Sequence, residues 1–265
     1  GVAASQSPAM STPINVAKIV YGAFAVPWAN RAAFARKLAT PFAFLVIFGV
    51  VETLWITQMP SPLLWGVIAL HLLVFVLFAV SCHRLVLLDT VTVAKAPLPR
   101  WTRRETRFLW RFIVLWFVSA AVGFTCIALL TFAVFPWLKK IEPTWLASLA
   151  TLLFMLPMYY ILARLSLVLP ATAVDRRVNL GWAWELSEGN SWRLLLVVGV
   201  LPWIVSIPAY LIDFAGPNVV VTVAMTMLGA ALLTVEISAL SLAYRELTRN
   251  EPPTPAPPPA FPQTA

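Results

Sequence analysis

Charged side chains, histidines and cysteines are scarce in this 265-residue chain, in which 11% of the residues carry a charge. Its two histidines, His71 and His83, are twelve residues apart on one expected helix, hence about 18 Å, so a single chain cannot clamp a haem between them. Cys82 and Cys126 lie at different depths of two expected spans, so we expect no disulfide between them. The Cys82–His83 pair lacks the further ligands of a zinc site. We therefore expect no cofactor and no metal.

Catalytic motifs are also missing. The three serines Ser81, Ser166 and Ser187 have no base at a recognisable spacing, and no nucleotide-binding motif is present. The chain is therefore not expected to be an enzyme. An enzyme that works within the membrane is the last of three function classes that remain.

The sequence is rich in long runs of apolar residues. Sixty per cent of the residues are hydrophobic and the mean hydropathy is +0.84, more than a soluble domain uses. A transmembrane helix needs about 20 apolar residues. We expect an all-α polytopic membrane protein with six transmembrane helices and interfacial amphipathic helices. The expected spans are residues 39–58, 63–83, 109–135, 145–169, 193–212 and 218–243.

The regions outside the spans define the domain organisation. We expect residues 1–12 to form a disordered leader and residues 13–249 to form a single membrane domain. We expect residues 250–265 to form a disordered tail, because seven of the eleven residues from 252 to 262 are proline. A solvated end is the first interpretation of this tail, and a site for a proline-recognition partner is the second.

The basic residues predict the topology. Lys139 and Lys140 follow the third span, whereas every other Lys and Arg falls on the opposite side. The positive-inside rule then places both termini in the cytosol of a bacterial inner membrane. We expect the net charge of +8 to face the bilayer and its anionic lipids, not nucleic acid.

Two segments are expected to lie on the membrane surface. Residues 15–38 have apolar residues at helical spacing and are expected to form an interfacial helix broken near Pro27. The fourth span is expected to stop at Pro170, and Asn179 to cap a short surface helix that ends at Ser187, before a left-handed Gly189. Candidate lipid-facing residues at the interface are Trp101, Arg103, Arg104, Arg176, Arg177, Trp182, Trp184 and Trp192.

Two pairs of polar residues are expected inside the membrane. Glu52 and His71 lie at matched depths on two spans joined by a short turn, and we predict that they share a hydrogen bond or a proton. A structural role and a proton relay are both open, and His71 as a pigment ligand is a further alternative. Arg164 and Glu236 also have matched depths and are expected to pair. Alternatively, Arg164 extends to the headgroups, while Glu236 is protonated or faces water.

Three segments resemble a known layout. The segments WANRAAFARKLATP, CHRLVLLD with WTRRETRFL, and RLSLVLPATAVD with AWELSEGNSWRLL resemble a broad group of uncharacterised bacterial six-helix inner-membrane proteins. That group is similar to the membrane portion that some bacteria fuse to a glycerophosphodiester phosphodiesterase domain. The resemblance covers about residues 14–247 and implies the fold. It does not carry over the enzymatic activity, because these 265 residues hold no soluble phosphodiesterase domain.

These observations favour a non-catalytic integral membrane protein, with an accessory, assembly or membrane-organising role. Its expected partners are the lipid bilayer, with anionic lipids at the cytosolic face, and a further membrane protein. The alternative is a small-solute or proton-coupled transporter or channel. That alternative is suggested by the four intramembrane polar residues and by Pro202 and Pro208, which should kink the fifth span.

Overall fold

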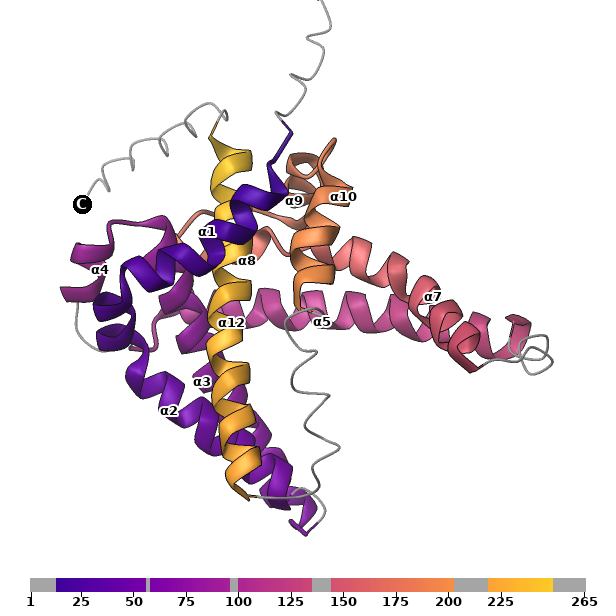
Figure 1. Ribbon diagram of the computed structural model, residues 1–265, viewed down its shortest axis with the longest axis horizontal. Helices are drawn as coiled ribbons and strands as arrows, with labels where there is room; N and C mark the ends of the chain where they lie inside the picture. Colours follow the sequence, from indigo (N-terminus) through magenta and orange to yellow (C-terminus); the bar gives the residue numbers. More distant parts are fainter. Residues whose placement is uncertain (1–12, 56–57, 96–99, 135–143, 203–218, 250–265) are drawn as a thin grey trace, which may run out of the picture.

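The computed structural model describes residues 13–55, 58–95, 100–134, 144–202 and 219–249, which form helices and no strand (Figure 1). Five helical stretches are long and apolar enough to cross a membrane, which supports an all-helical multi-pass membrane protein. These stretches are Arg31–Trp55, Ser61–Leu87, Arg103–Ala133, Leu153–Ala173 and Val219–Thr248. Half of the expected span 193–212 lies outside the described residues, so the sixth span stays a prediction.

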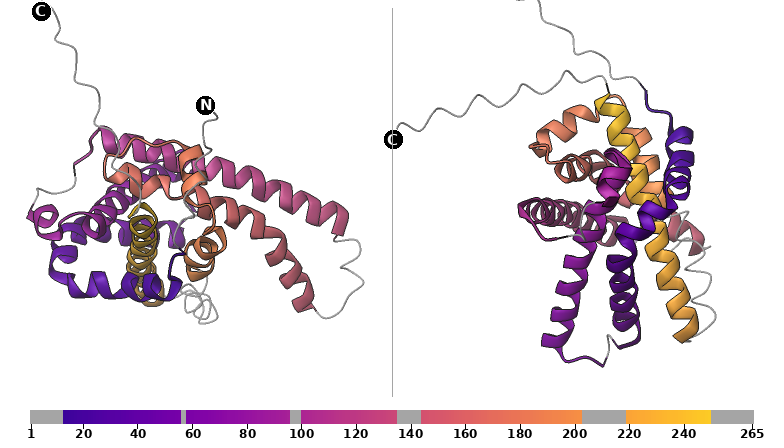
Figure 2. Two further views of the ribbon diagram at one scale, coloured as in Figure 1. Left: turned by 90° about the horizontal axis from the view of Figure 1, so that it is seen from above. Right: turned by 90° about the vertical axis from the view of Figure 1, so that its left-hand side faces the viewer.

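The long helices form two arms. The first arm contains α2 (Arg31–Trp55), α3 (Ser61–Leu87) and α12 (Val219–Thr248), which pack on one another. The second arm contains α5 (Arg103–Leu129) and α7 (Thr144–Leu165). Figure 1 shows the first arm pointing down and the second pointing right, and both views of Figure 2 agree that the arms diverge.

The arms meet at a junction with the shorter helices. The elements of this junction are the adjoining ends of the long helices together with α1 (Val16–Ala29), α4 (Thr90–Lys95), α8 (Val168–Ala173), α9 (Leu180–Leu186), α10 (Ser191–Leu194) and the π-helix η2 (Leu195–Val200). A second π-helix, η1 (Leu130–Val134), continues α5 at the far end of the second arm.

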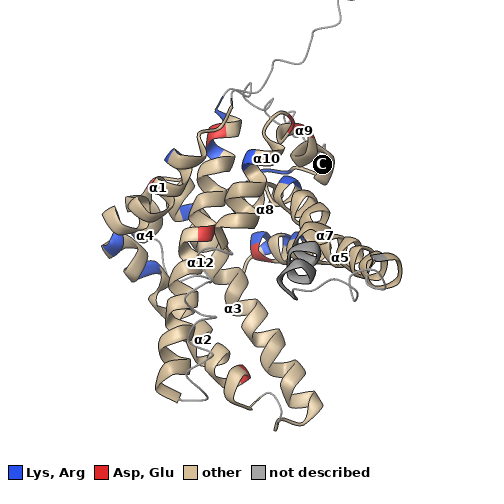
Figure 3. Cartoon of the chain, turned by 45° about the vertical axis from the view of Figure 1, so that its right-hand side comes forward, with Lys and Arg blue, Asp and Glu red and all other residues tan. Residues whose placement is uncertain are grey.

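Burial is concentrated at the junction. In α3 the buried residues begin at Val76, and in α12 they begin at Ala230 and cluster from Val235 onward, so the opposite ends of both helices are mostly uncovered. The Lys and Arg residues gather at this same end of the molecule (Figure 3). Such a distribution is typical of helices whose far parts face lipid and whose basic ends face the headgroups.

Helices α1 and α2 begin and end at other residues than the sequence predicted. Helix α1 continues through Pro27 to Ala29, and Asn30 separates it from α2. Helix α2 therefore begins at Arg31, eight residues before the expected span, because hydropathy detects the apolar part of a helix and not its basic first turns. Helix α1 packs across α12, where Lys18 Nζ lies 3.3 Å from a Glu246 carboxylate oxygen.

Pro170 does not stop the fourth span. Helix α7 ends earlier, at Leu165, and α8 begins at Val168 with Pro170 inside its first turn. This position tolerates proline, because the first turn of a helix contains N–H groups that have no partner within the helix. The predicted short helix is present as α9, in which Asn179 accepts a hydrogen bond from the Trp182 N–H, and Gly189 has a φ of 76°.

Two glycines offer a matched test of how closely the helices of the first arm pack. A Cβ added to Gly49 on α2 would lie 2.6 Å from Cγ2 of Thr226 on α12, whereas a Cβ on Gly66 of α3 would meet nothing within 4 Å. Both changes to alanine gain the same helix propensity. We therefore expect Gly49→Ala to be less stable than Gly66→Ala by about 1 kcal/mol. Unfolding midpoints in mild detergent measure the difference, and equal midpoints would contradict the close packing.

Candidate anion-binding site

The first turns of α5 carry a row of arginines. Thr102 caps this helix by accepting from the Arg104 N–H, while its own N–H donates to the buried Glu105 carboxylate, 2.8 Å away. This reciprocal cap fixes where the helix begins. Arg103, Arg107 and Arg111 follow at a spacing of four residues, so they lie along one face of α5.

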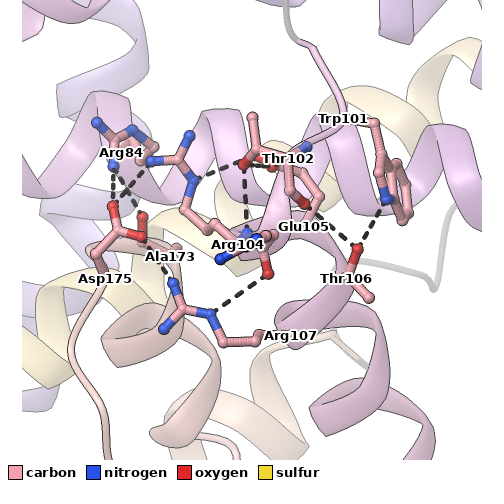
Figure 4. Close-up of polar contacts among 10 residues, drawn as sticks. Arg84, Trp101, Thr102, Arg104, Glu105, Thr106, Arg107, Ala173 and Asp175 are labelled. Carbon is pink, nitrogen blue, oxygen red and sulfur yellow. Dashed lines mark hydrogen bonds and ion pairs between the residues drawn. The ribbon is translucent and has the colours of Figure 1, made fainter.

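Asp175 binds three arginines from two different helices. Its Oδ2 accepts from Arg104 at 2.9 Å and from Arg84 on α3 at 3.4 Å, and its Oδ1 accepts from Arg107 at 3.2 Å (Figure 4). Arg84 also donates to the Ala173 carbonyl at 3.1 Å. Asp175 has a φ of 65°, a left-handed conformation that Asp tolerates better than most residues. The turn after α8 therefore joins α3 to α5.

A cleft of about 730 Å³ opens between α5 and the chain that follows α8. We call it the arginine cleft, and its lining residues are Arg103, Thr106, Arg107, Trp110, Arg111, Thr172, Arg176 and Arg177. Trp110 is 66% exposed and presents its ring at this surface. A planar guanidinium matches a phosphate through two parallel hydrogen bonds, so the residue types of this cleft favour a phosphate-bearing ligand.

The charges around the cleft do not balance. The five arginines of the lining, with Arg84 and Arg104 beside them, make seven positive charges, and Asp175 and Glu105 supply two negative ones. The excess of five positive charges favours an anion. Among the described residues, no group of His, Cys, Asp and Glu could hold a metal ion.

The predicted interfacial tryptophans have individual contacts. The Trp101 Nε1–H donates to Thr106 Oγ1 at 2.9 Å, beside the arginine cleft. Arg176 lies over the Trp182 ring, at 4.8 Å from its centroid. The Trp192 ring is 66% exposed and packs against the Tyr160 ring.

The structure brings Glu52 and His71 together. His71 Nδ1 lies 2.8 Å and 2.9 Å from the two carboxylate oxygens of Glu52, and both side chains are partly buried. The two residues sit on α2 and α3, which pack along their lengths, and the short connection between these helices sets their register. The Phe48 ring packs beside His71, so this polar pair lies within an otherwise apolar arm.

The predicted ion pair between Arg164 and Glu236 is not formed. Arg164 is buried, and its Nε donates to Ser187 Oγ at 2.7 Å while its Nη2 donates to the Trp184 carbonyl. Its guanidinium also stacks over the Trp184 ring, at 3.6 Å from the centroid. Matched depth is not sufficient for this pair: α7 packs mainly on α5 and η2, and α12 packs mainly on α1, α2 and α3 and also contacts η2.

Part of this site could be predicted from the sequence. The prediction singled out Arg103, Arg104, Arg176 and Arg177 as lipid-facing residues of two separate segments, which the structure places in or beside one cleft. It missed Arg107 and Arg111, although their spacing of four residues from Arg103 was a usable signal. No sequence pattern indicated the three arginine partners of Asp175.

Comparison with known protein families, curated proteins and solved structures finds no match for this chain. The resemblance in layout therefore stays a prediction.

Proposed function

We propose that the protein is a non-catalytic integral membrane component that binds the headgroups of anionic phospholipids in its arginine cleft. An accessory or membrane-organising role in a bacterial inner membrane, with both termini cytosolic, is part of this proposal. The observation that carries it is the cleft of about 730 Å³ lined by five arginines, of which Arg103, Arg111 and Arg177 have no carboxylate within ion-pair distance among the described residues.

The position of the cleft supports a lipid as the anion. Arg103 is the first residue of α5, and Arg111 lies two turns further along, where the candidate span becomes apolar. Beyond it, Trp116 and Phe117 are exposed on the same helix. A headgroup in the cleft would therefore have its acyl chains beside an apolar helix surface, as a phospholipid requires.

The double variant Arg103→Gln with Arg111→Gln tests the proposal. We expect the amount of anionic phospholipid that copurifies in mild detergent to fall by more than about ten-fold, because two charge-assisted contacts to phosphate are lost. Lipid extraction followed by mass spectrometry measures the amount per protein. Arg245→Gln is the matched control, because Arg245 is exposed near the end of α12 and lies outside the cleft. Equal lipid in the double variant and the control would exclude the cleft as the lipid site.

A proton-coupled transporter is the second candidate, favoured by the Glu52–His71 pair within the first arm. The other carboxylates among the described residues of α2, α3 and α12 are Glu236 and Glu246, and Glu246 has an ion pair with Lys18. A relay needs a succession of such groups, so the arm supports a structural pair better than a proton path. Proton flux into liposomes that contain the protein separates the two functions.

A further inference from the structure

We infer that the arginine cleft is matched to a ligand with two phosphate groups in one headgroup. This inference rests on the proposed function and narrows its ligand class. Three observations lead to it: the length of the arginine row on α5, the position of Asp175 within that row, and the number of arginines that lack a carboxylate.

The arginine row is long enough for two phosphates. Arg103 and Arg111 are eight residues apart on α5, hence about 12 Å along the helix axis. Hydrogen bonds from guanidinium to phosphate oxygens are only about 3 Å long. The two ends of the row are therefore suited to two phosphates of one ligand better than to a single phosphate.

Asp175 divides the row in the middle. Its Oδ1 accepts from Arg107 at 3.2 Å, so the central arginine already has an anionic partner. Arg103 lies one helical turn before Arg107 and Arg111 one turn after it. This arrangement leaves two cationic positions with a carboxylate between them, which separates the two anions that the cleft would hold.

The charge count also favours two phosphates. Within the described part of the chain, Arg103, Arg111 and Arg177 have no carboxylate within ion-pair distance. All three line the cleft. A phosphodiester with one negative charge would leave two of these charges without a counterion, whereas a headgroup with two phosphates leaves one at most.

Binding to defined lipids tests this inference on the full chain in detergent. Native mass spectrometry would follow titrations with cardiolipin, whose headgroup has two phosphates, and with phosphatidylglycerol, which has one. We expect cardiolipin to bind about ten-fold more tightly. In Arg103→Gln or in Arg111→Gln alone, cardiolipin should lose about ten-fold in affinity and bind about as well as phosphatidylglycerol, because one phosphate position is gone. Arg245→Gln should retain the preference.

The outcomes separate the inference from the proposed function. Equal binding of the two lipids, with the same dependence on Arg103 and Arg111, would overturn the two-phosphate ligand and leave the lipid function intact. Binding of neither lipid in an arginine-dependent way would overturn both. Glycerol with a phosphate on each terminal carbon, a soluble part of the cardiolipin headgroup, serves as the lipid-free probe: if it binds more tightly than cardiolipin with the same arginine dependence, the two-phosphate ligand stands and its lipid source is wrong. Arg103→Lys, which retains the charge, should keep more affinity than Arg103→Gln.

Discussion

Replacement of Arg164 by alanine is expected to lower the free energy of unfolding by about 3–5 kcal/mol, because several buried contacts of a charged group are lost together. The guanidinium donates to Ser187 Oγ at 2.7 Å and to the Trp184 carbonyl. It also stacks on the Trp184 ring, a contact worth about 2 kcal/mol when it is shielded from water. Chemical unfolding in mild detergent measures the change.

Two further variants make the Arg164 result interpretable. Arg164→Lys retains the charge but loses the planar group that stacks and donates in two directions, so it should recover only part of the stability. Arg245→Ala removes an exposed arginine and should change the stability by less than about 0.5 kcal/mol. An Arg164→Ala protein as stable as Arg245→Ala would contradict the role of these contacts.

Charge reversal separates this interpretation from an ion pair with Glu236. Since Arg164 contacts α9 and the residue that follows it, not α12, Arg164→Glu combined with Glu236→Arg should be no more stable than Arg164→Glu alone. Recovery in the double variant would show that the two side chains meet after all. The contacts of Arg164 matter for the proposed site, because α9 follows the segment that supplies Arg176 and Arg177 to the cleft.

The sequence predicts structural features that depend only on residues close together in the chain. The apolar runs predict where the candidate spans lie, because a membrane helix must be apolar over about 20 residues. The Asn179 cap and the left-handed Gly189 were predicted for the same reason, since both depend on local backbone geometry. The Glu52–His71 contact could be predicted because a short turn leaves two helices side by side.

The sequence does not predict contacts between distant segments. Apolar helices have few features that select one neighbour over another. Nothing in the sequence therefore indicated that α7 packs mainly on α5 and η2, or that Arg164 binds α9 and not α12. The arginine cleft could not be predicted for the same reason, because it also forms between segments that are distant in the sequence. Its two walls come from residues 103–111 and 172–177, and they are joined by the packing of α5 on α8 and by the ion pairs of Asp175 with Arg104 and Arg107.

Loss of the Glu52 carboxylate is expected to destabilise the first arm. Glu52→Ala leaves His71 without its hydrogen-bond partner in an apolar arm, and we expect a cost of about 2 kcal/mol in unfolding free energy. Glu52→Gln retains an oxygen that can accept a hydrogen bond, so it should cost less than half as much. Thermal or chemical unfolding in detergent measures both variants. Equal losses for the two would show that the carboxylate charge, and not the hydrogen bond, matters.

The same Glu52→Gln variant distinguishes a structural pair from a proton relay, because an amide cannot take up and release a proton as a carboxylate does. With a structural pair, liposomes containing the wild-type protein or Glu52→Gln should show the same proton flux as liposomes without protein. A flux that the wild-type protein supports and Glu52→Gln abolishes, at unchanged folded yield, would instead favour the transporter. The arginine cleft lies on other helices, so its lipid binding should be the same in either case, which makes the two measurements independent.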